Sequence, residues 1–145
     1  MDLINLAVDP ERELNGAEVR PWEDETVLTI ARYNNPKFRD MQARLMEPYV
    51  RKAGRKGVST AQAEEILARC MAKTLLLGWE NLKLEGEVVE YSKEKALELL
   101  SDTRLADFKE VVMLESQNLE NYRLEALEED LGNSETSSDT MQDGV

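Results

Sequence analysis

Apolar residues recur every three to four positions after Ser59, which is the spacing of an amphipathic helix. Ser59 is followed three residues later by Gln62, so the two side chains match a capping box at the start of this helix. Residues 75–77 are apolar on every side, so this end is predicted to be buried, to end at Gly78 and to pack under Trp79. The apolar stripe consists of Ala63, Ile66, Leu67, Cys70, Met71, Thr74 and Leu75.

Three more helices are predicted from the same spacing. Asn35-Pro36 begins the first, because asparagine caps a helix and proline is tolerated at its first position. Pro48 is predicted to end or kink this helix near Glu47. Ser92 caps the next helix, and Asp102-Thr103 opens the last. Their inward residues are Phe38, Met41, Leu45, Met46, Ala96, Leu97, Leu99, Leu100, Leu105, Phe108, Val111, Val112, Leu119 and Tyr122.

The first third of the chain has extended patterns instead. Residues 1–8 predict a short strand or an ordered arm, which Asp9-Pro10 interrupts. Asn15-Gly16 is the dipeptide favoured in a type I′ hairpin turn, and residues 17–22 supply a return strand. Residues 26–32 are enriched in β-branched side chains and predict another strand.

Two further segments complete the expected organisation. Residues 81–91 fit a short central hairpin and an irregular loop equally well. Residues 128–145 are polar and acidic, so they are predicted to be a disordered tail. We therefore expect a mainly α fold of four to five helices with a minor N-terminal β element. It forms a single domain, 1–127, whose first part, 1–35, is extended.

Eight apolar residues on these stripes form the predicted structural core. Trp79 is expected to be buried against the final helix near Phe108. Any aromatic side chain that is exposed instead becomes a candidate anchor for a partner. The eight core residues are Leu67, Met71, Leu75, Trp79, Leu97, Leu100, Phe108 and Val112.

The charge of the chain narrows the choice of partners. Its 145 residues carry a net charge of −12, which argues against nucleic acid and anionic membranes as partners. Residues 125–145 hold seven acidic and no basic side chains, so residues 1–124, with 18 basic and 23 acidic, carry only −5. One basic cluster, at Arg51, Lys52, Arg55 and Lys56, is either a solvated connector or a docking patch for an acidic partner, such as the tail itself.

Candidate chemistry is sparse. The chain has no histidine, which removes the commonest general base and most zinc sites. Cys70, the only cysteine, lies on an apolar stripe, so a buried thiol is favoured over a nucleophile, and a reducing compartment is expected. Phosphate-binding glycine loops, calcium loops, a signal peptide and apolar runs of about 20 residues are all missing from the sequence. We expect no enzyme, no cofactor and no metal.

With these residues placed, the chain resembles the tail assembly chaperones of long-tailed, siphovirus-type bacteriophages. The resemblance covers residues 16–123. It rests on three segments in this order: IARYNNPKF at 30–38, LLLGWEN at 75–81 and YSKEKALELL at 91–100. Pro48-Tyr49 and the helix of Phe108 add to it.

The resemblance implies a non-enzymatic assembly factor of the host bacterial cytoplasm that is not part of the mature virion. Such proteins bind the tape measure protein, keep it soluble and support assembly of the tail tube around it. The family often makes a second, longer product by ribosomal frameshifting, and this longer product is expected to contact the tail tube protein. Association of several copies, as a homo-oligomer, fits a long client. The family supplies no catalytic residue and no fixed partner-binding position.

Two other functions remain open from the sequence. One is a structural head–tail or other virion component, which would be found in purified particles. The other is an acidic DNA mimic that inhibits a host nuclease. A mimic needs its carboxylates on the folded body, whereas the acidic excess of this chain lies mostly in residues 125–145.

Overall fold

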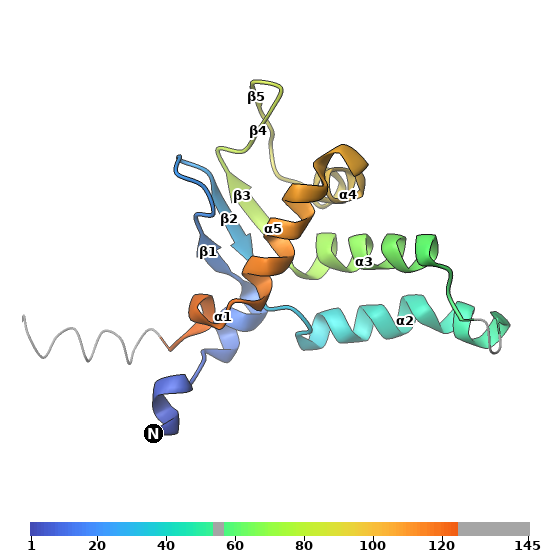
Figure 1. Cartoon of the computed structure of the whole chain (residues 1–145), viewed down its shortest axis with the longest axis horizontal. Coiled ribbons are helices and arrows are strands. Elements are labelled where there is room, and N and C mark those ends of the chain that lie inside the picture. Colours follow the sequence, from blue (N-terminus) through green and yellow to red (C-terminus); the bar gives the residue numbers. More distant parts are fainter. Residues whose placement is uncertain (54–56, 125–145) are drawn as a thin grey trace, which may run out of the picture.

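The computed structural model describes residues 1–53 and 57–124. The predicted disordered tail and the domain boundary at 127 lie outside these residues. Within them the fold is mainly helical, as predicted, with five α-helices and two small sheets (Figure 1). In chain order the elements are η1 Leu3–Leu6, α1 Pro10–Asn15, β1 Ala17–Val19, β2 Val27–Ile30, α2 Pro36–Ala53, α3 Thr60–Thr74, β3 Leu76–Glu80, β4 Lys83–Leu84, β5 Glu87–Val88, α4 Lys93–Ser101, η2 Thr103–Leu105, α5 Ala106–Gln117 and η3 Leu119–Tyr122.

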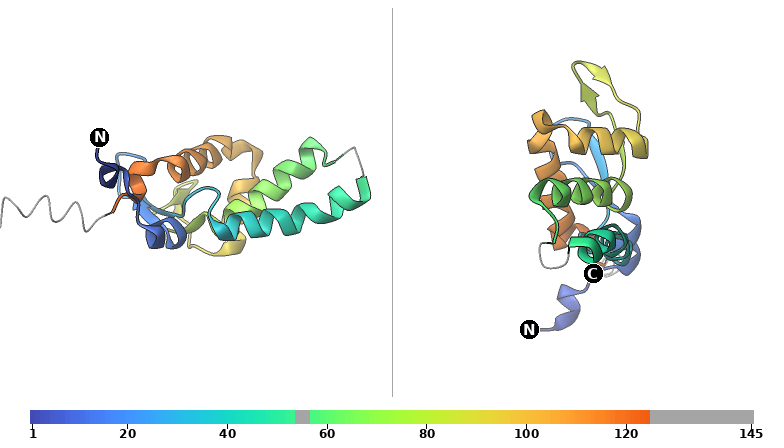
Figure 2. Two further views of the ribbon diagram at one scale, coloured as in Figure 1. Left: turned by 90° about the horizontal axis from the view of Figure 1, so that it is seen from below. Right: turned by 90° about the vertical axis from the view of Figure 1, so that its right-hand side faces the viewer.

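The centre of the molecule is an antiparallel sheet in the order β1-β2-β3, with α5 lying across it (Figure 1). α2 and α3 pack side by side and extend away from the sheet, and α4 packs on α3 (Figure 2). The hairpin β4–β5 projects from the end of the sheet that is farther from α1 (Figure 1). The core therefore lies between the sheet, α5 and the inner faces of α3 and α4.

The apolar run at 75–77 was predicted to be the end of a helix. In the structure it is a turn that leads into the third strand. α3 ends at Thr74, and β3 begins at Leu76 and pairs with β2, so that Trp79 lies opposite Leu28. Leu75 and Leu76 are both fully buried. A short run that is apolar on every side fits a buried strand as well as a buried helix, which is why periodicity misassigned it.

The N-terminal segment also differs from its prediction. Of the two alternatives predicted for residues 1–8, the strand does not form: Leu3–Leu6 is the 3-10 helix η1 of an ordered arm, and Val8 makes one bridge to Arg123. Asp9-Pro10 does not interrupt a strand but begins α1, where the Asp9 carboxylate accepts a hydrogen bond from the Glu11 amide at 3.0 Å. Asn15-Gly16 ends this helix instead of forming a hairpin turn. Gly16 has a φ of 100°, and a Cβ there would lie 2.8 Å from Thr29 Cγ2.

The predicted helix starts are confirmed by their hydrogen bonds. Ser59 Oγ accepts from the Gln62 amide at 3.2 Å, and Gln62 Oε1 accepts from the Ser59 amide at 3.0 Å. Asn35 Oδ1 accepts from the third residue of α2 at 3.0 Å. Ser92 caps α4, and Asp102 caps η2, which leads into α5. The strands at 17–19 and 27–30 and the central hairpin also form.

Pro48 does not end the second helix, because α2 continues through it to Ala53. Proline removes one hydrogen bond of the helix and crowds the preceding turn, at a cost of about 3 kcal/mol. Leu45, Met46 and Tyr49 lie on both sides of Pro48 and pack against the core cluster. This packing against α3 offsets the loss and keeps the helix continuous.

The eight expected core residues all contact the core cluster, but to different depths. Met71, Leu75, Trp79, Leu100 and Val112 are buried, whereas Leu67, Leu97 and Phe108 are partly exposed. The expected partner of Trp79 was wrong. Its ring meets the edge of Tyr91, with centroids 4.9 Å apart, while Phe108 pairs with Trp22. Because β3 is a strand, Trp79 faces the segment that follows the hairpin and not the last helix.

Residues 7–9 and 122–124, close to the two ends of the described chain, meet beside the sheet. Tyr122 is fully buried, and its hydroxyl donates to the Ile30 carbonyl at 3.0 Å. Its own carbonyl accepts from the Asp9 amide at 2.7 Å, and the Leu124 amide donates to the Ala7 carbonyl at 3.3 Å. Residues near 123 thus close the side of the domain where the chain begins.

Candidate functional site

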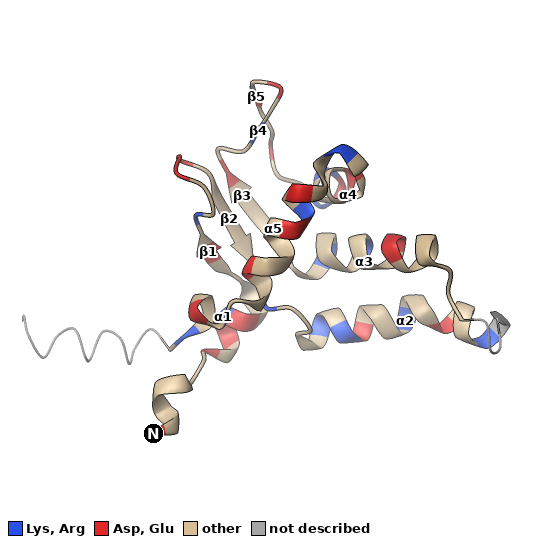
Figure 3. Cartoon of the chain, viewed as in Figure 1, with Lys and Arg blue, Asp and Glu red and all other residues tan. Residues whose placement is uncertain are grey.

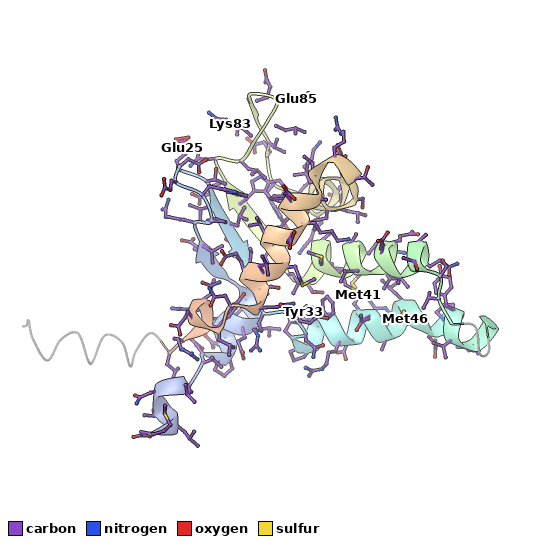
Figure 4. The ribbon with its side chains drawn as sticks, in the orientation of Figure 1. Glu25, Tyr33, Met41, Met46, Lys83 and Glu85 are labelled. Carbon is purple, nitrogen blue, oxygen red and sulfur yellow. The ribbon has the colours of Figure 1, made fainter. Side chains whose placement is uncertain are left out.

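An open hollow, which we call the apolar groove, lies beside the β4–β5 hairpin. It has a volume of about 360 Å³ and receives side chains from the β1–β2 loop, the hairpin, α4, η2 and α5. Asp24 and Lys83 are the charged residues of its lining. Figure 4 shows Lys83 on the hairpin, near Glu25 of the facing loop. The apolar lining residues are Trp22, Leu82, Leu84, Val89, Leu99, Leu105 and Phe108.

The hairpin wall of the groove is held from below by Trp79. Its indole Nε1 donates to the Val89 carbonyl at 2.7 Å, and the Val89 amide donates to the Leu82 carbonyl at 2.8 Å. Glu85 and Gly86 both have positive φ, 53° and 83°, which suits the tight turn of a two-residue hairpin. The groove wall is therefore built on a buried tryptophan.

Tyr91 fixes Trp79 in turn. The two rings meet edge to face at an interplanar angle of 82°, an arrangement that aromatic pairs prefer. The Tyr91 hydroxyl donates to the Leu76 carbonyl at 2.9 Å. Burial raises the pKa of Tyr91, and the charge of Glu94 raises it further. Both polar groups of this pair are hydrogen-bonded, so the support beneath the groove is rigid.

The opposite wall is the β1–β2 loop, which is tied to the start of the hairpin. Thr26 Oγ1 donates to the Asn81 carbonyl at 3.0 Å, and Asn81 Nδ2 donates to the Glu25 carbonyl at 3.1 Å. The Thr26 amide donates to the Asp24 carboxylate at 2.8 Å. These bonds hold the loop that carries Trp22 at a fixed position relative to the hairpin.

Trp22 is the most exposed aromatic side chain of the groove. It is 36% exposed and stacks on Phe108, with centroids 6.5 Å apart and an interplanar angle of 15°. Within the described residues its indole N–H donates no hydrogen bond. Val88 adds a 61% exposed apolar side chain on the hairpin. A concave apolar surface with a half-exposed tryptophan suits the binding of apolar side chains.

A larger hollow of about 560 Å³ lies between α1 and the start of α2, but its polar groups bind one another. Arg32 Nη1 lies 2.7 Å from Glu13 Oε2, and Arg39 Nη1 donates to the Asn34 carbonyl at 2.7 Å. Tyr33, labelled in Figure 4, packs its ring on Phe38. The polar contacts of this hollow therefore hold α1 and the β2–α2 connection in place. The apolar groove is the better candidate for a partner-binding site.

The remaining candidates offer little chemistry. Cys70 is fully buried, as predicted, and burial raises the pKa of its thiol. In residues 1–53 and 57–124, acidic and cysteine side chains nowhere gather in threes that could hold a metal ion. The same residues include no helix of the length and hydropathy that would cross a bilayer. Of the predicted basic cluster, the structure describes only the side chain of Arg51, which pairs with Glu47 at 3.1 Å.

Sequence reasoning did not single out Trp22. Trp22 lies in the extended segment that the family resemblance covers, but as a contact residue it was considered only within the group of aromatic residues, any exposed member of which would be a candidate. The local signal was present, because Trp22 stands alone between Pro21 and an acidic run at 23–25. An isolated aromatic residue in a polar loop has no neighbouring apolar stripe to bury it.

Comparison with known proteins gives one match. The family described as YdaY prophage protein matches residues 33–133, which include α2 to η3 and most of the residues of the apolar groove. No curated protein and no solved structure matches the chain. The match covers more than half of the 145 residues and indicates a phage-derived protein. The chain belongs to the YdaY prophage protein family.

Proposed function

We propose that this phage-derived protein is a tail assembly chaperone that binds the tape measure protein and keeps it soluble while the tail tube assembles. It acts by binding and not by catalysis, in the host cytoplasm, and leaves before the virion is complete. The observation that carries the proposal is the apolar groove with its half-exposed Trp22. The resemblance of residues 16–123 to that class of chaperone, together with the phage origin, supplies the client.

The shape of the groove fits such a client. A tape measure protein is long, helical and apolar along much of its length, so alone it aggregates through exposed stripes. One turn or two of an amphipathic helix place side chains at i, i+3, i+4 and i+7, which can enter an apolar groove. Trp22 and Phe108 form the anchor of the groove, and Leu84 and Val89 form the facing wall. The proposal assigns each bound copy a short stretch of the client.

The charge of the protein supports the same role. The chain carries −12, and its acidic side chains lie over several elements of the described surface (Figure 3). A net charge of this size keeps a complex dispersed in solution when apolar surfaces are being covered. Several copies along one client, or a homo-oligomer, would multiply that effect. Contact with the tail tube protein would belong to a longer, frameshifted product.

The experiment is co-expression of the phage's tape measure protein with and without this protein, followed by centrifugation. We expect the tape measure protein to be soluble only when this protein is present. Trp22→Ala should move it to the pellet, because the anchor of the groove is lost. Val50→Ala is the matched control, since Val50 is 57% exposed on α2 and is not part of the groove lining.

Two outcomes would contradict the proposal. One is equal partition of the tape measure protein to the pellet with and without this protein, including when any longer product is present. The other is recovery of this protein from purified virions at stoichiometric levels, which would favour a structural head–tail component instead.

A further inference from the structure

A second hollow, which we call the basic groove, lies where α2, α3 and α4 meet. It has a volume of about 430 Å³. Arg69 and Lys73 of α3 and Lys93 of α4 line it, and Met41 of α2 contributes to its apolar part. Figure 4 places Met41 between α2 and α3. Within the described residues, Glu94 is the only acidic side chain of the lining.

Positive charge is concentrated around this groove although the protein is strongly acidic. Lys37 lies about one helical turn before Met41, and its charge and that of Lys73 both reach Lys93. Burial lowers the pKa of Lys93, and the charges of Lys73 and Lys37 lower it further. Arg44 lies about one turn after Met41. Its charge and that of Arg69 both act on the buried thiol of Cys70, whose pKa they lower against the effect of burial. Three cationic side chains thus line one concave surface, and Lys37 adds its charge near Lys93 and Arg44 near Arg69.

These cations are not neutralised by the part of the chain that the structure describes. Lys37, Arg44, Arg69 and Lys73 form no ion pair with a described acidic side chain. Lys93 Nζ donates to the backbone carbonyl of Lys73 at 2.8 Å, and this neutral acceptor provides no counter-charge for Lys93. Unpaired like charges repel one another, so an acidic segment placed in the groove would be stabilised by the three cations that line it.

The chain itself supplies such a segment. Residues 125–145 contain seven acidic side chains and no basic one. They follow Leu124, whose amide donates to the Ala7 carbonyl. Twenty-one residues can span roughly 70 Å, which is about twice the diameter of a domain of this size. The segment is therefore long enough to reach the basic groove of its own chain.

We propose that the acidic C-terminal segment, residues 125–145, docks in the basic groove between α2, α3 and α4 of the same molecule. The occupant is chosen by charge complementarity and by its covalent attachment, which gives it an effective concentration of about millimolar order. An acidic segment of another protein then has to displace it. The proposal does not depend on the tape measure protein or on the apolar groove.

Zero-length carbodiimide cross-linking tests this directly on the full chain. The reagent joins a lysine amine to a carboxylate only when the two are in contact. We expect amide links from Lys37, Lys73 and Lys93 to acidic residues between 125 and 143, in the monomer fraction and at low salt. An equal mixture of ¹⁵N-labelled and unlabelled protein distinguishes links within one chain from links between chains. Lys83, which is exposed on the hairpin, should give roughly tenfold fewer links, because single exposed ion pairs are weak.

A charge-reversal variant sharpens the test. Arg44→Glu with Arg69→Glu changes the groove but leaves the cross-linkable lysines in place, so the yield should fall roughly tenfold. Arg20→Glu with Arg104→Glu introduces the same change of charge away from the groove and should keep the yield. Raising the salt to about 1 M should abolish the links, because screening then acts within about 3 Å.

Three results would overturn the proposal. They are equal yields at Lys83 and at the groove lysines, links found only between differently labelled chains, and yields that the Arg44 and Arg69 reversal leaves unchanged. If the reversal variant fails to fold, the position and isotope pattern of the wild-type links still decide.

Discussion

Two aromatic pairs next to the β4–β5 hairpin are built in opposite ways. Trp79 and Tyr91 meet edge to face at 4.9 Å, and each donates its polar hydrogen to a backbone carbonyl. Trp22 and Phe108 stack at 6.5 Å, and Trp22 is 36% exposed. The first pair has its hydrogen-bonding and packing satisfied inside the chain. The second pair keeps an apolar surface that the described chain leaves uncovered.

The difference separates a pair that supports the fold from a pair that is available to contact a partner. A buried tryptophan whose N–H is hydrogen-bonded positions its neighbours, and removing it costs folding free energy. A half-exposed tryptophan on a concave surface gains contacts only when a partner arrives. One hairpin joins the two functions, because Val89 accepts the hydrogen bond of Trp79 and lines the groove of Trp22.

The largest effect is expected from Trp79→Ala. It removes a buried ring, its edge contact with Tyr91 and the bond to Val89, so the free energy of unfolding should fall by about 3–5 kcal/mol. Urea denaturation followed by circular dichroism measures the loss. A denaturation midpoint equal to that of the wild type would mean that Trp79 does not support the hairpin.

Tyr91→Phe should have a smaller effect, because it keeps the ring and removes only the hydroxyl. The Leu76 carbonyl then loses its side-chain donor, at a cost of about 1–2 kcal/mol. The same denaturation experiment measures this cost, and Tyr49→Phe, for which no hydrogen bond is seen in the described residues, is the matched control. Equal losses for both variants would show that the hydroxyl of Tyr91 contributes nothing.

Alkaline pH should lower the stability of the fold through two tyrosines, Tyr91 of the pair with Trp79 and Tyr122 of η3. Burial raises the pKa of Tyr91 and also that of Tyr122, so the unfolded chain loses these protons first. Stability is therefore fully present below the unfolded pKa near 10 and is lost as pH rises towards the raised folded pKa. The urea midpoint should fall between about pH 9 and pH 11, and Tyr91→Phe should reduce that fall. A midpoint independent of pH over this range would contradict the burial of both hydroxyls.

The smallest effect on stability is expected from Trp22→Ala. The ring is partly exposed and donates no hydrogen bond to the described chain, so the loss should be roughly 1 kcal/mol or less. Binding of an apolar helical client should weaken by about 2 kcal/mol or more, as is typical for an interfacial tryptophan. Denaturation and fluorescence titration measure the two quantities separately. A loss of stability as large as that of Trp79→Ala would erase the distinction between the pairs.

Local signals in the sequence predicted most of the elements correctly. The caps at Ser59, Ser92 and Asn35 each formed the hydrogen bond that the pattern required. The helix end at Pro48, one of its two predicted outcomes, and the assignment of residues 75–77 were wrong because the conformation there depends on contacts far along the chain, with α3 in one case and with β2 in the other. Asp9-Pro10 was a readable helix start that was interpreted as a break.

The apolar groove could not be predicted, because its walls come from five separate elements. Trp22 and Phe108 are 86 positions apart, and no local pattern brings them together. The basic groove is similar, since its cations are spread over 37–93 and look like ordinary solvated faces of three helices. The cluster at Arg51 stood out because its basic residues are close together in the sequence. A charged surface built from several helices gives no such local signal.

The burial of Tyr122 has a consequence for the order in which the protein is made. Its hydroxyl donates a hydrogen bond to the Ile30 carbonyl, and its own backbone carbonyl accepts one from the Asp9 amide. A ribosome has synthesised β1, β2 and the α2–α3 pair long before residue 122, so the nascent sheet leaves the tunnel with that side open. Native closure has to wait until nearly the whole described chain has been translated. An incomplete chain therefore presents an unfinished sheet to the quality-control machinery of the cell.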